Sequence, residues 1–283
     1  MSKEIVFPKN RKEVFLTLIK YHKLDLLKIN LIIAGFAFLT LLAIYLATLL
    51  IFSVPVLISN GTIEMVKQDD YDYSVLFTSL MYLITLFVIL IFTNIPLFLG
   101  LGGGIYVISQ LCYGEADVLI GKDFFIGIKR NAKQMILLSL LFSFAALFMV
   151  FVLSVYLLIT VPLAVRIISY VIAIVVFFIV SVVVFIAINY QNIYEVSFWE
   201  LLKNSFLIAF SKPLSTIGFF LLANIFFYLL VIPIRIPIFI LLVLFIGFSY
   251  FLSIEFLYTS SLFDEYINKK AHESLVDKGM KKN

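Results

Sequence analysis

Charge is scarce along this chain, and its scarcity excludes a soluble protein. Asp, Glu, Lys and Arg make up 13% of the 283 residues, whereas 63% are hydrophobic and the mean hydropathy is +1.14. A water-soluble core of this length cannot cover so many apolar side chains. The few charges gather in short blocks between long apolar runs, and in lipid such runs must pair their backbone groups internally. The pattern predicts an all-α integral membrane protein.

Cysteine and histidine are also scarce, which removes several kinds of chemistry. The single cysteine, Cys112, excludes an internal disulfide. The two histidines, His22 and His272, belong to no metal-binding spacing, and no histidine or aspartate falls inside a predicted membrane segment. We therefore expect no catalytic residues, no metal site and no cofactor. The small net charge of +4 gives no reason to expect a nucleic-acid partner.

Six apolar segments are long enough to cross the ~30 Å hydrocarbon core of a bilayer, which takes ~20 helical residues. The six predicted transmembrane helices are residues 29–58, 76–99, 135–159, 167–188, 214–231 and 238–262. They form a membrane domain over residues 29–262, between an amphipathic cytoplasmic segment (1–28) and a charged cytoplasmic tail (263–283). No short apolar segment with a small-residue cleavage site precedes them, so the first span is expected to be an anchor.

The basic residues predict how the chain is threaded through the membrane. Of the 21 Lys and Arg residues, only Lys67, Arg166 and Arg235 fall in the connections on one side of the predicted bundle, which leaves 18 on the other. Cytoplasmic loops carry the excess of Lys and Arg, so both termini are predicted to be cytoplasmic, in agreement with an even number of spans. The expected location is the cell membrane, with the lipid bilayer as the first partner.

A repeated unit groups the predicted spans into hairpins. Residues 123–129, Asp-Phe-Phe-Ile-Gly-Ile-Lys, align with residues 197–203, Ser-Phe-Trp-Glu-Leu-Leu-Lys, and a looser copy starts at Leu24. The first two copies begin with a good N-cap residue, and Ser197 with Glu200 makes a capping box. Each of these two is followed by a span, a proline, an arginine and a return span. We predict short amphipathic cytoplasmic helices that lead into helical hairpins.

Two interpretations of these leading helices remain open. They form a platform for a cytoplasmic partner or fit the groove of another membrane subunit, or they lie in the membrane interface and position the spans. Trp199 suits the second interpretation, because indole prefers the interface. The residues that would carry either role are Phe124, Phe125 and Lys129 in one copy and Phe198, Trp199 and Lys203 in the other.

A proline and a glycine-rich stretch end the second predicted span: Pro96 lies inside the span, and Gly100 to Gly104 follow it. As one helix, residues 76–113 would extend roughly 57 Å, which is longer than one crossing. Pro96 and the glycines are therefore expected to bend or break the helix, so that the chain turns and continues as a separate cytoplasmic or interfacial helix to Tyr113. The glycines permit either close helix packing or a positive φ, and they lack the order of a phosphate-binding loop.

Three polar residues inside the predicted spans are candidates for an intramembrane site. Glu255 is the sharpest, because a charged side chain deep in a span costs ~3 kcal/mol and is normally paired, protonated or facing water. It is interpreted either as a proton or ligand site or as a helix–helix hydrogen bond. The partners considered for such a bond are Asn30, Asn189, Gln191 and a tyrosine of the same leaflet. Asn94 and Asn224 are weaker candidates of the same kind.

Several motifs resemble those of the YesL-like family (DUF624) of multi-pass bacterial membrane proteins. They are Asn-Ile-Pro-Leu-Phe-Leu-Gly at 94–100, Tyr-Gly-Glu-Ala-Asp at 113–117, Phe-Phe-Ile-Gly-Ile-Lys-Arg-Asn at 124–131 and Leu-Leu-Lys-Asn-Ser at 201–205. The resemblance covers about residues 76–232, and the chain departs from the family in its first span, in its tail and in Gly-Gly-Gly at 102–104. A weaker resemblance, through the same repeated helices, is to the six-span membrane domain found with glycerophosphodiester phosphodiesterases.

Family resemblance implies association with carbohydrate uptake systems but no known mechanism, so it carries over no functional residue. We expect a non-catalytic accessory protein of a membrane transport system, with the membrane subunits of an ABC transporter as its partners. Two alternatives remain. The first is a transporter of a small or lipid-like solute that uses Glu255, and the second is a structural protein that organises lipid.

Overall fold

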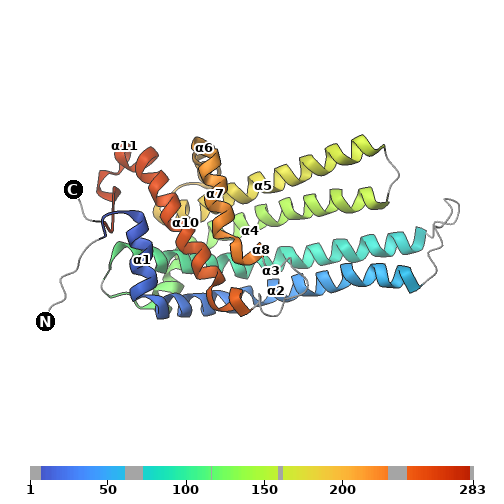
Figure 1. Ribbon diagram of the computed structural model, residues 1–283, viewed down its shortest axis with the longest axis horizontal. Coiled ribbons are helices and arrows are strands. Elements are labelled where there is room, and N and C mark those ends of the chain that lie inside the picture. The colour runs from blue at the N-terminus through green and yellow to red at the C-terminus, as the bar shows by residue number, and fades with distance from the viewer. Residues whose placement is uncertain (1–7, 61–72, 116, 159–161, 229–240, 281–283) are drawn as a thin grey trace. The chain divides into compact units, whose positions relative to one another are not determined.

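The structure, a computed structural model, describes residues 8–60, 73–115, 117–158, 162–228 and 241–280. Every element within these residues is helical (Figure 1). The α-helices are α1 (Arg11–Tyr21), α2 (Lys23–Asn60), α3 (Tyr73–Tyr113), α4 (Ile120–Leu158), α5 (Leu163–Ile193), α6 (Phe198–Ser211), α7 (Pro213–Ala223), α8 (Ile225–Tyr228), α10 (Phe248–Phe263) and α11 (Lys269–Ala271). Two π-helical turns, η3 (Val243–Gly247) and η4 (Asp264–Asn268), and a 3-10 turn, η5 (Glu273–Leu275), lie in the C-terminal part.

Five helices in the described residues are long and apolar enough to cross a membrane, and a sixth span results if one bent pair counts as a single span. The five stretches are Lys23–Ala43, Val88–Tyr113, Ile120–Leu153, Leu163–Ile193 and Val243–Ala271. The bent pair is α6 with α7, whose directions differ by 105°. The prediction of an all-α chain with several membrane-spanning helices is therefore confirmed, with five or six in place of a fixed six.

The chain forms two compact units, each assembled from separate stretches. Unit 1 consists of Met1–Phe36, Phe98–Leu138 and Ser181–Asn283, and unit 2 of Ala37–Leu97 and Ser139–Val180. The boundaries fall inside α2, α3, α4 and α5, so each of these long helices contributes residues to both units.

Antiparallel contacts join consecutive helices within each unit. In unit 2 the rings of Phe142 on α4 and Phe177 on α5 lie 5.5 Å apart, and the Tyr170 hydroxyl donates to the Leu153 carbonyl at 3.3 Å. Along α5, therefore, the contacted position on α4 falls as the residue number rises. In unit 1, α7 packs on α10 in the same sense, with the Thr216 hydroxyl 2.7 Å from the hydroxyl of Tyr258. Phe227 of α8 then contacts Phe248, earlier on α10.

The turn predicted after Pro96 does not form, because α3 runs unbroken from Tyr73 to Tyr113. A proline removes one helical N–H, which weakens the bonds to the carbonyls three and four residues before it. One of these carbonyls belongs to Thr93, and the hydroxyl of Thr40 on α2 donates to it at 2.6 Å. A neighbouring side chain thus compensates for the proline, as is common in membrane helices. The prediction of a separate helix over 105–113 is wrong.

The glycines of α3 serve close packing between helices and make no turn. None of the four glycines between Gly100 and Gly104 has a positive φ in this described stretch. A Cβ atom on Gly103 would lie 2.7 Å from the carbonyl oxygen of Phe124 in α4, and one on Gly104 would lie 2.6 Å from Cδ1 of Ile33 in α2. Small residues in membrane helices allow such close backbone approach. Of the two predicted roles of the glycines, close packing is confirmed.

Only one of the two leading helices predicted from the closer repeat copies is separate from its span. Residues 123–129 belong to α4, which continues to Leu158, so the separate helix predicted there is wrong. Asp123 lies in the first turns of α4, where its carboxylate accepts a hydrogen bond from the Leu119 N–H at 2.7 Å. In the other copy Ser197 caps α6, and its predicted capping box with Glu200 is confirmed. The loosest copy, near residue 24, is the start of α2.

Pro213 explains why the two copies differ. It is the first residue of α7, and Lys212 before it has a φ of −137°, outside the helical range. Proline suits the first position of a helix because it has no N–H to leave unpaired, and it disfavours helical backbone in the residue before it. In register with Pro213, the α4 copy has Ser139, which lets the helix continue. The second proline-arginine connection, at 233–235, lies outside the described residues.

The last helical segment extends beyond its predicted end at residue 262. α10 passes directly into η4 and α11, so helical structure continues to Ala271, and Asp264 and Asn268 are buried. The chain then turns back onto α3. Gly279 has a φ of +85°, and a Cβ there would clash with the carbonyl of Cys112. The described residues of the predicted tail are therefore part of the packed structure of unit 1.

A buried amide stabilises the π-helical turn at the start of this segment. A π-turn shifts the helical hydrogen bonds by one residue and leaves backbone groups without their usual partners. Asn30 on α2, which is 0% exposed, donates to the carbonyls of Val243 at 3.1 Å and Leu244 at 2.6 Å. Its side-chain oxygen accepts the N–H of Ser249 at 2.9 Å. The side chain of Asn30 therefore bonds to the residues in and just after η3, and the hydrogen bond to Glu255 expected as one alternative does not form.

The packing role of the α3 glycines can be tested with Gly103→Ala. Because the added Cβ would lie 2.7 Å from a backbone oxygen, overpacking is expected to cost ~1–3 kcal/mol. We expect a lower thermal unfolding midpoint of the purified protein in detergent. Gly35→Ala is the matched control, because no atom lies within 4 Å of a Cβ there and alanine favours a helix by ~1 kcal/mol. Equal midpoints for the two variants would contradict this role.

Candidate functional site

Glu255 lies on α10 in the interior of unit 1 and is 0% exposed. Neither oxygen of its side chain has a hydrogen-bond partner within the described residues. The hydroxyl of Thr259, one helical turn later, donates to the backbone carbonyl of Glu255 at 2.7 Å and so does not serve the carboxyl group. Burying an isolated carboxylate costs a large amount of free energy, so among the polar side chains described in unit 1 Glu255 is the one whose burial is expected to cost most.

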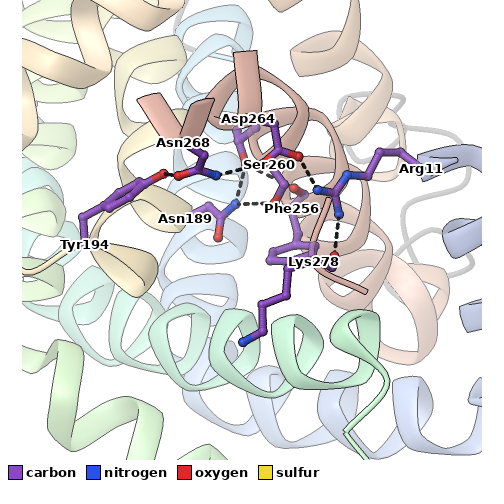
Figure 2. A network of polar contacts seen from close by, with 9 residues as sticks. Arg11, Asn189, Tyr194, Phe256, Ser260, Asp264, Asn268 and Lys278 are labelled. Atoms are coloured by element: carbon purple, nitrogen blue, oxygen red, sulfur yellow. Dashed lines mark hydrogen bonds and ion pairs between the residues drawn. The ribbon is translucent and has the colours of Figure 1, made fainter. Parts of the chain in front are cut away.

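Asn189 places a second unused acceptor in the same region. Its amide donates to the hydroxyl oxygens of Thr259 at 2.6 Å and Ser260 at 3.4 Å, whereas its own side-chain oxygen is buried without a partner. Figure 2 shows these bonds crossing from α5 to the C-terminal helix. Glu255 and Asn189 therefore offer more hydrogen-bond acceptors than their described surroundings supply donors.

The two other intramembrane candidates have ordinary structural partners. Asn94 belongs to unit 2, where its amide donates to the hydroxyl of Ser143 at 2.9 Å. Asn224 follows the last residue of α7, and its side chain donates to the carbonyl of Phe220 at 2.9 Å. This local bond satisfies a carbonyl at the helix end. Both asparagines are explained by helix packing and capping, and neither is joined to Glu255 by a hydrogen bond in the described residues.

The aromatic and basic candidates fall into buried and exposed groups. Phe124 is 0% exposed, with its ring 5.9 Å from that of Phe36, so it belongs to the core of unit 1 and is unavailable to a partner. In contrast, Phe125 is 55% exposed and Trp199 is 79% exposed. Phe198 is half-buried beside Trp199, at 6.2 Å between rings. The side chains of Lys129 and Lys203 are exposed.

A buried polar network joins the two ends of the chain, and the sequence did not reveal it. Arg11 of α1 donates to the carboxylate of Asp264 in η4 at 2.6 Å and to the carbonyl of Lys278 at 3.3 Å (Figure 2). The side chains of this ion pair are 15% and 10% exposed. Asn268 in turn donates to the other oxygen of Asp264 at 2.7 Å. Low exposure strengthens each of these charge-assisted bonds.

Tyr194 completes this network from the segment that follows α5. Its hydroxyl donates to the side-chain oxygen of Asn268 at 2.6 Å. Burial, helped by the negative charge of Asp264, raises the pKa of Tyr194, so the phenol remains a neutral donor at physiological pH. The only signal in the sequence is the spacing of Asp264 and Asn268, one helical turn apart. The pairing of Asp264 with Arg11, 253 residues away, cannot be predicted from local spacing.

Comparisons with models of known protein families, with curated proteins and with solved structures find no match for this chain. The resemblance to the YesL-like family therefore stays a prediction. Within the described residues, no three His, Cys, Asp or Glu side chains gather in a way that would hold a metal ion. The candidate site is thus Glu255 with Asn189, the exposed start of α6, and the Arg11 network that holds the surrounding helices.

The Arg11–Asp264 pair can be tested with Arg11→Met and Asp264→Asn. Each change leaves a largely buried charge without its partner, which is expected to cost ~3–5 kcal/mol. Both single variants should unfold at lower temperature in detergent and should lose the N-terminal helix to limited proteolysis sooner. Lys12→Met is the control, because Lys12 is an exposed neighbour on the same helix. The double variant should lose less stability than the sum of the two single losses, and a loss equal to that sum would argue against a direct pair.

Proposed function

We propose that this protein is a non-catalytic accessory of a membrane transport system, a multi-pass protein of the cell membrane with both termini in the cytoplasm. The orientation is supported by the 18 basic residues assigned to one side. The resemblance to the YesL-like family supports a transport system for carbohydrates. The proposed partners are the membrane subunits of an ABC transporter.

The observation that carries this proposal is the exposure of α6 at its sharp bend from α7. If α7 crosses the bilayer, a bend of 105° lays α6 nearly parallel to the membrane surface. Trp199, 79% exposed, and the exposed Lys203 then project from the start of this surface helix. Phe206 and Phe210 on the same face are 45% and 49% exposed. Such a helix fits the apolar groove of a second membrane subunit, and tryptophan is enriched at the centre of interfaces.

A photo-crosslinking amino acid placed at Trp199 tests this proposal in the native membrane. We expect crosslinks to membrane subunits of a transporter. The same amino acid at Leu214 is the control, because Leu214 is 86% exposed but lies beyond the bend. In parallel, Trp199→Asp should lower co-purification of the crosslinked subunit ~10-fold or more, because tryptophan anchors often contribute 2 kcal/mol or more. Crosslinks to lipid alone at both positions would indicate an interfacial anchor and overturn the proposal.

A second candidate function, transport by the protein itself, is supported by the buried acceptors of Glu255 and Asn189. A carboxyl group with no described hydrogen-bond partner is a place where a proton or a solute donor would be held. Glu255→Gln keeps the shape of the side chain and removes its acidic proton. We expect this variant to lose solute flux in liposomes while its unfolding midpoint stays close to that of the parent chain.

Glu273→Gln is the control for this experiment, because it makes the same chemical change at an exposed position. Flux that survives Glu255→Gln, or no flux of any solute in a broad panel, would exclude transport through Glu255. The accessory function makes the opposite prediction, because it expects no flux from the protein alone.

A further inference from the structure

A polar pocket of about 210 Å³ lies in unit 1. It shares Lys278 with the Arg11 network, but its lining includes neither Glu255, Asn189 nor any residue of α6. It is formed by the end of α3, the start of α4, the end of α5 and the C-terminal turn. Its polar lining consists of Ser109, Gln110, Glu115, Arg130, Asn192 and Lys278, with two tyrosines beside them. The volume is about seven times the ~30 Å³ that a water molecule occupies in the liquid, so a small ligand with its hydration water fits.

Two cations are held at this pocket by the rings of α3. The guanidinium of Arg130 lies 5.9 Å from the centre of the Tyr106 ring, and the ammonium of Lys278 lies 4.1 Å from that of Tyr113. The two rings are seven residues apart on α3 and so share one face of the helix. Both cations are therefore positioned before any ligand arrives.

The lining has an excess of positive charge. Glu115, the acidic residue of the lining, is 4.0 Å from Lys278, at the limit of an ion pair. Arg130 has no ion pair within the described part of the chain. Its five N–H donors suit an oxyanion. The pocket therefore favours an anion of small size.

A buried hydrogen-bond acceptor beside the cations indicates that the ligand also carries a donor. The side-chain oxygen of Gln110 is buried and has no hydrogen-bond partner in the described residues. An unpaired buried acceptor is costly, so a ligand that fits here brings a donor. Two other lining residues, Ser109 and Asn192, are held in place. The Asn192 amide donates to the Ser109 hydroxyl at 3.2 Å and accepts from Asn131 at 3.4 Å. These bonds join α3, α4 and α5.

We propose that this pocket binds a phosphate group that carries a proton. The two cations take the negatively charged oxygens. The P–O–H group donates to the oxygen of Gln110 once rotation of the amide, whose terminal torsion is broad, turns this buried oxygen toward the pocket. Inorganic phosphate retains such a hydrogen at neutral pH, whereas sulfate has the same shape and charge but no hydrogen to donate. The proton-bearing headgroup of phosphatidic acid has the same chemistry as free phosphate. Selection of phosphate over sulfate follows, because sulfate would leave Gln110 unpaired.

Titration of the full chain in uncharged detergent with inorganic phosphate and with sulfate tests this selection. We expect phosphate to bind at least ~10-fold more tightly than sulfate. Arg130→Ala should weaken phosphate binding by ~10-fold or more, because it removes a charge-assisted bond. Lys129→Ala is the matched control, because it removes the same charge from the neighbouring residue, which does not line the pocket. Equal weakening by both variants would indicate only a general field and would overturn the proposal.

Gln110→Leu separates a role in binding from a role in folding. It removes the unpaired acceptor, so the ligand-free protein should unfold at the same temperature or higher. Phosphate binding should fall to the level of sulfate, and sulfate binding should not decrease. Phosphate selectivity that survives this change would contradict the assignment of Gln110.

Nanodiscs of phosphatidylcholine with added phosphatidic acid, or with added phosphatidylglycerol, distinguish the two sources of the phosphate. Retention of phosphatidic acid but not phosphatidylglycerol, lost in Arg130→Ala and kept in Lys129→Ala, supports the lipid headgroup. Binding of inorganic phosphate in detergent without lipid selectivity supports the free ion. Binding of neither phosphate nor phosphatidic acid refutes the site and leaves the accessory function untouched, because that function depends on α6.

Discussion

Unit 1 depends on the close approach of α3 to the helices around it. At Gly103 and Gly104 there is no room for a Cβ atom beside α4 and α2. The approach continues one turn later, where a Cβ on Gly127 of α4 would lie 2.5 Å from Cβ of Tyr106. With the two helices this close, the guanidinium of Arg130 reaches the ring of Tyr106. The glycines therefore pack the core and also determine where the polar end of α3 places its side chains.

A second constraint is that polar groups inside apolar helices must find partners within the chain. Most of those described do so. Asn30 serves the π-turn η3, Thr40 serves the carbonyl left weak by Pro96, and Asn94 pairs with Ser143. Against this background Glu255 is exceptional, because its two oxygens are buried without a partner in the described residues. A group that the fold itself does not use is a better candidate for function than one that stabilises a helix.

Features that depend on local chemistry were predictable from the sequence, and features that depend on distant partners were not. Long apolar runs indicated the helices, Ser197 with Glu200 indicated the start of α6, and close packing was one of the two roles predicted for the glycines of α3. The break predicted near Pro96 was wrong because a hydroxyl from Thr40, 56 positions earlier, bonds to the Thr93 carbonyl, whose helical hydrogen bond the proline weakens. Phe124 was predicted to be a partner-binding or interfacial residue together with Phe125, but its side chain is buried in the core of unit 1, and only Phe125 is exposed. In the sequence, Pro213 is the only signal for the break between α6 and α7.

The two units also differ in the chemistry that they can support. Among the described residues of unit 2, Arg166 is the only charged side chain, and much of α5 there exposes Ile and Val. Exposed branched aliphatic side chains suit a lipid environment. Unit 1 holds Glu255, the Arg11 network, the exposed start of α6 and the pocket of Arg130 and Lys278. Recognition of a charged ligand or of a polar partner surface needs such groups, so the described part of the chain concentrates its capacity for function in unit 1. Unit 2 then has the simpler physical requirement of matching its apolar surface to the bilayer.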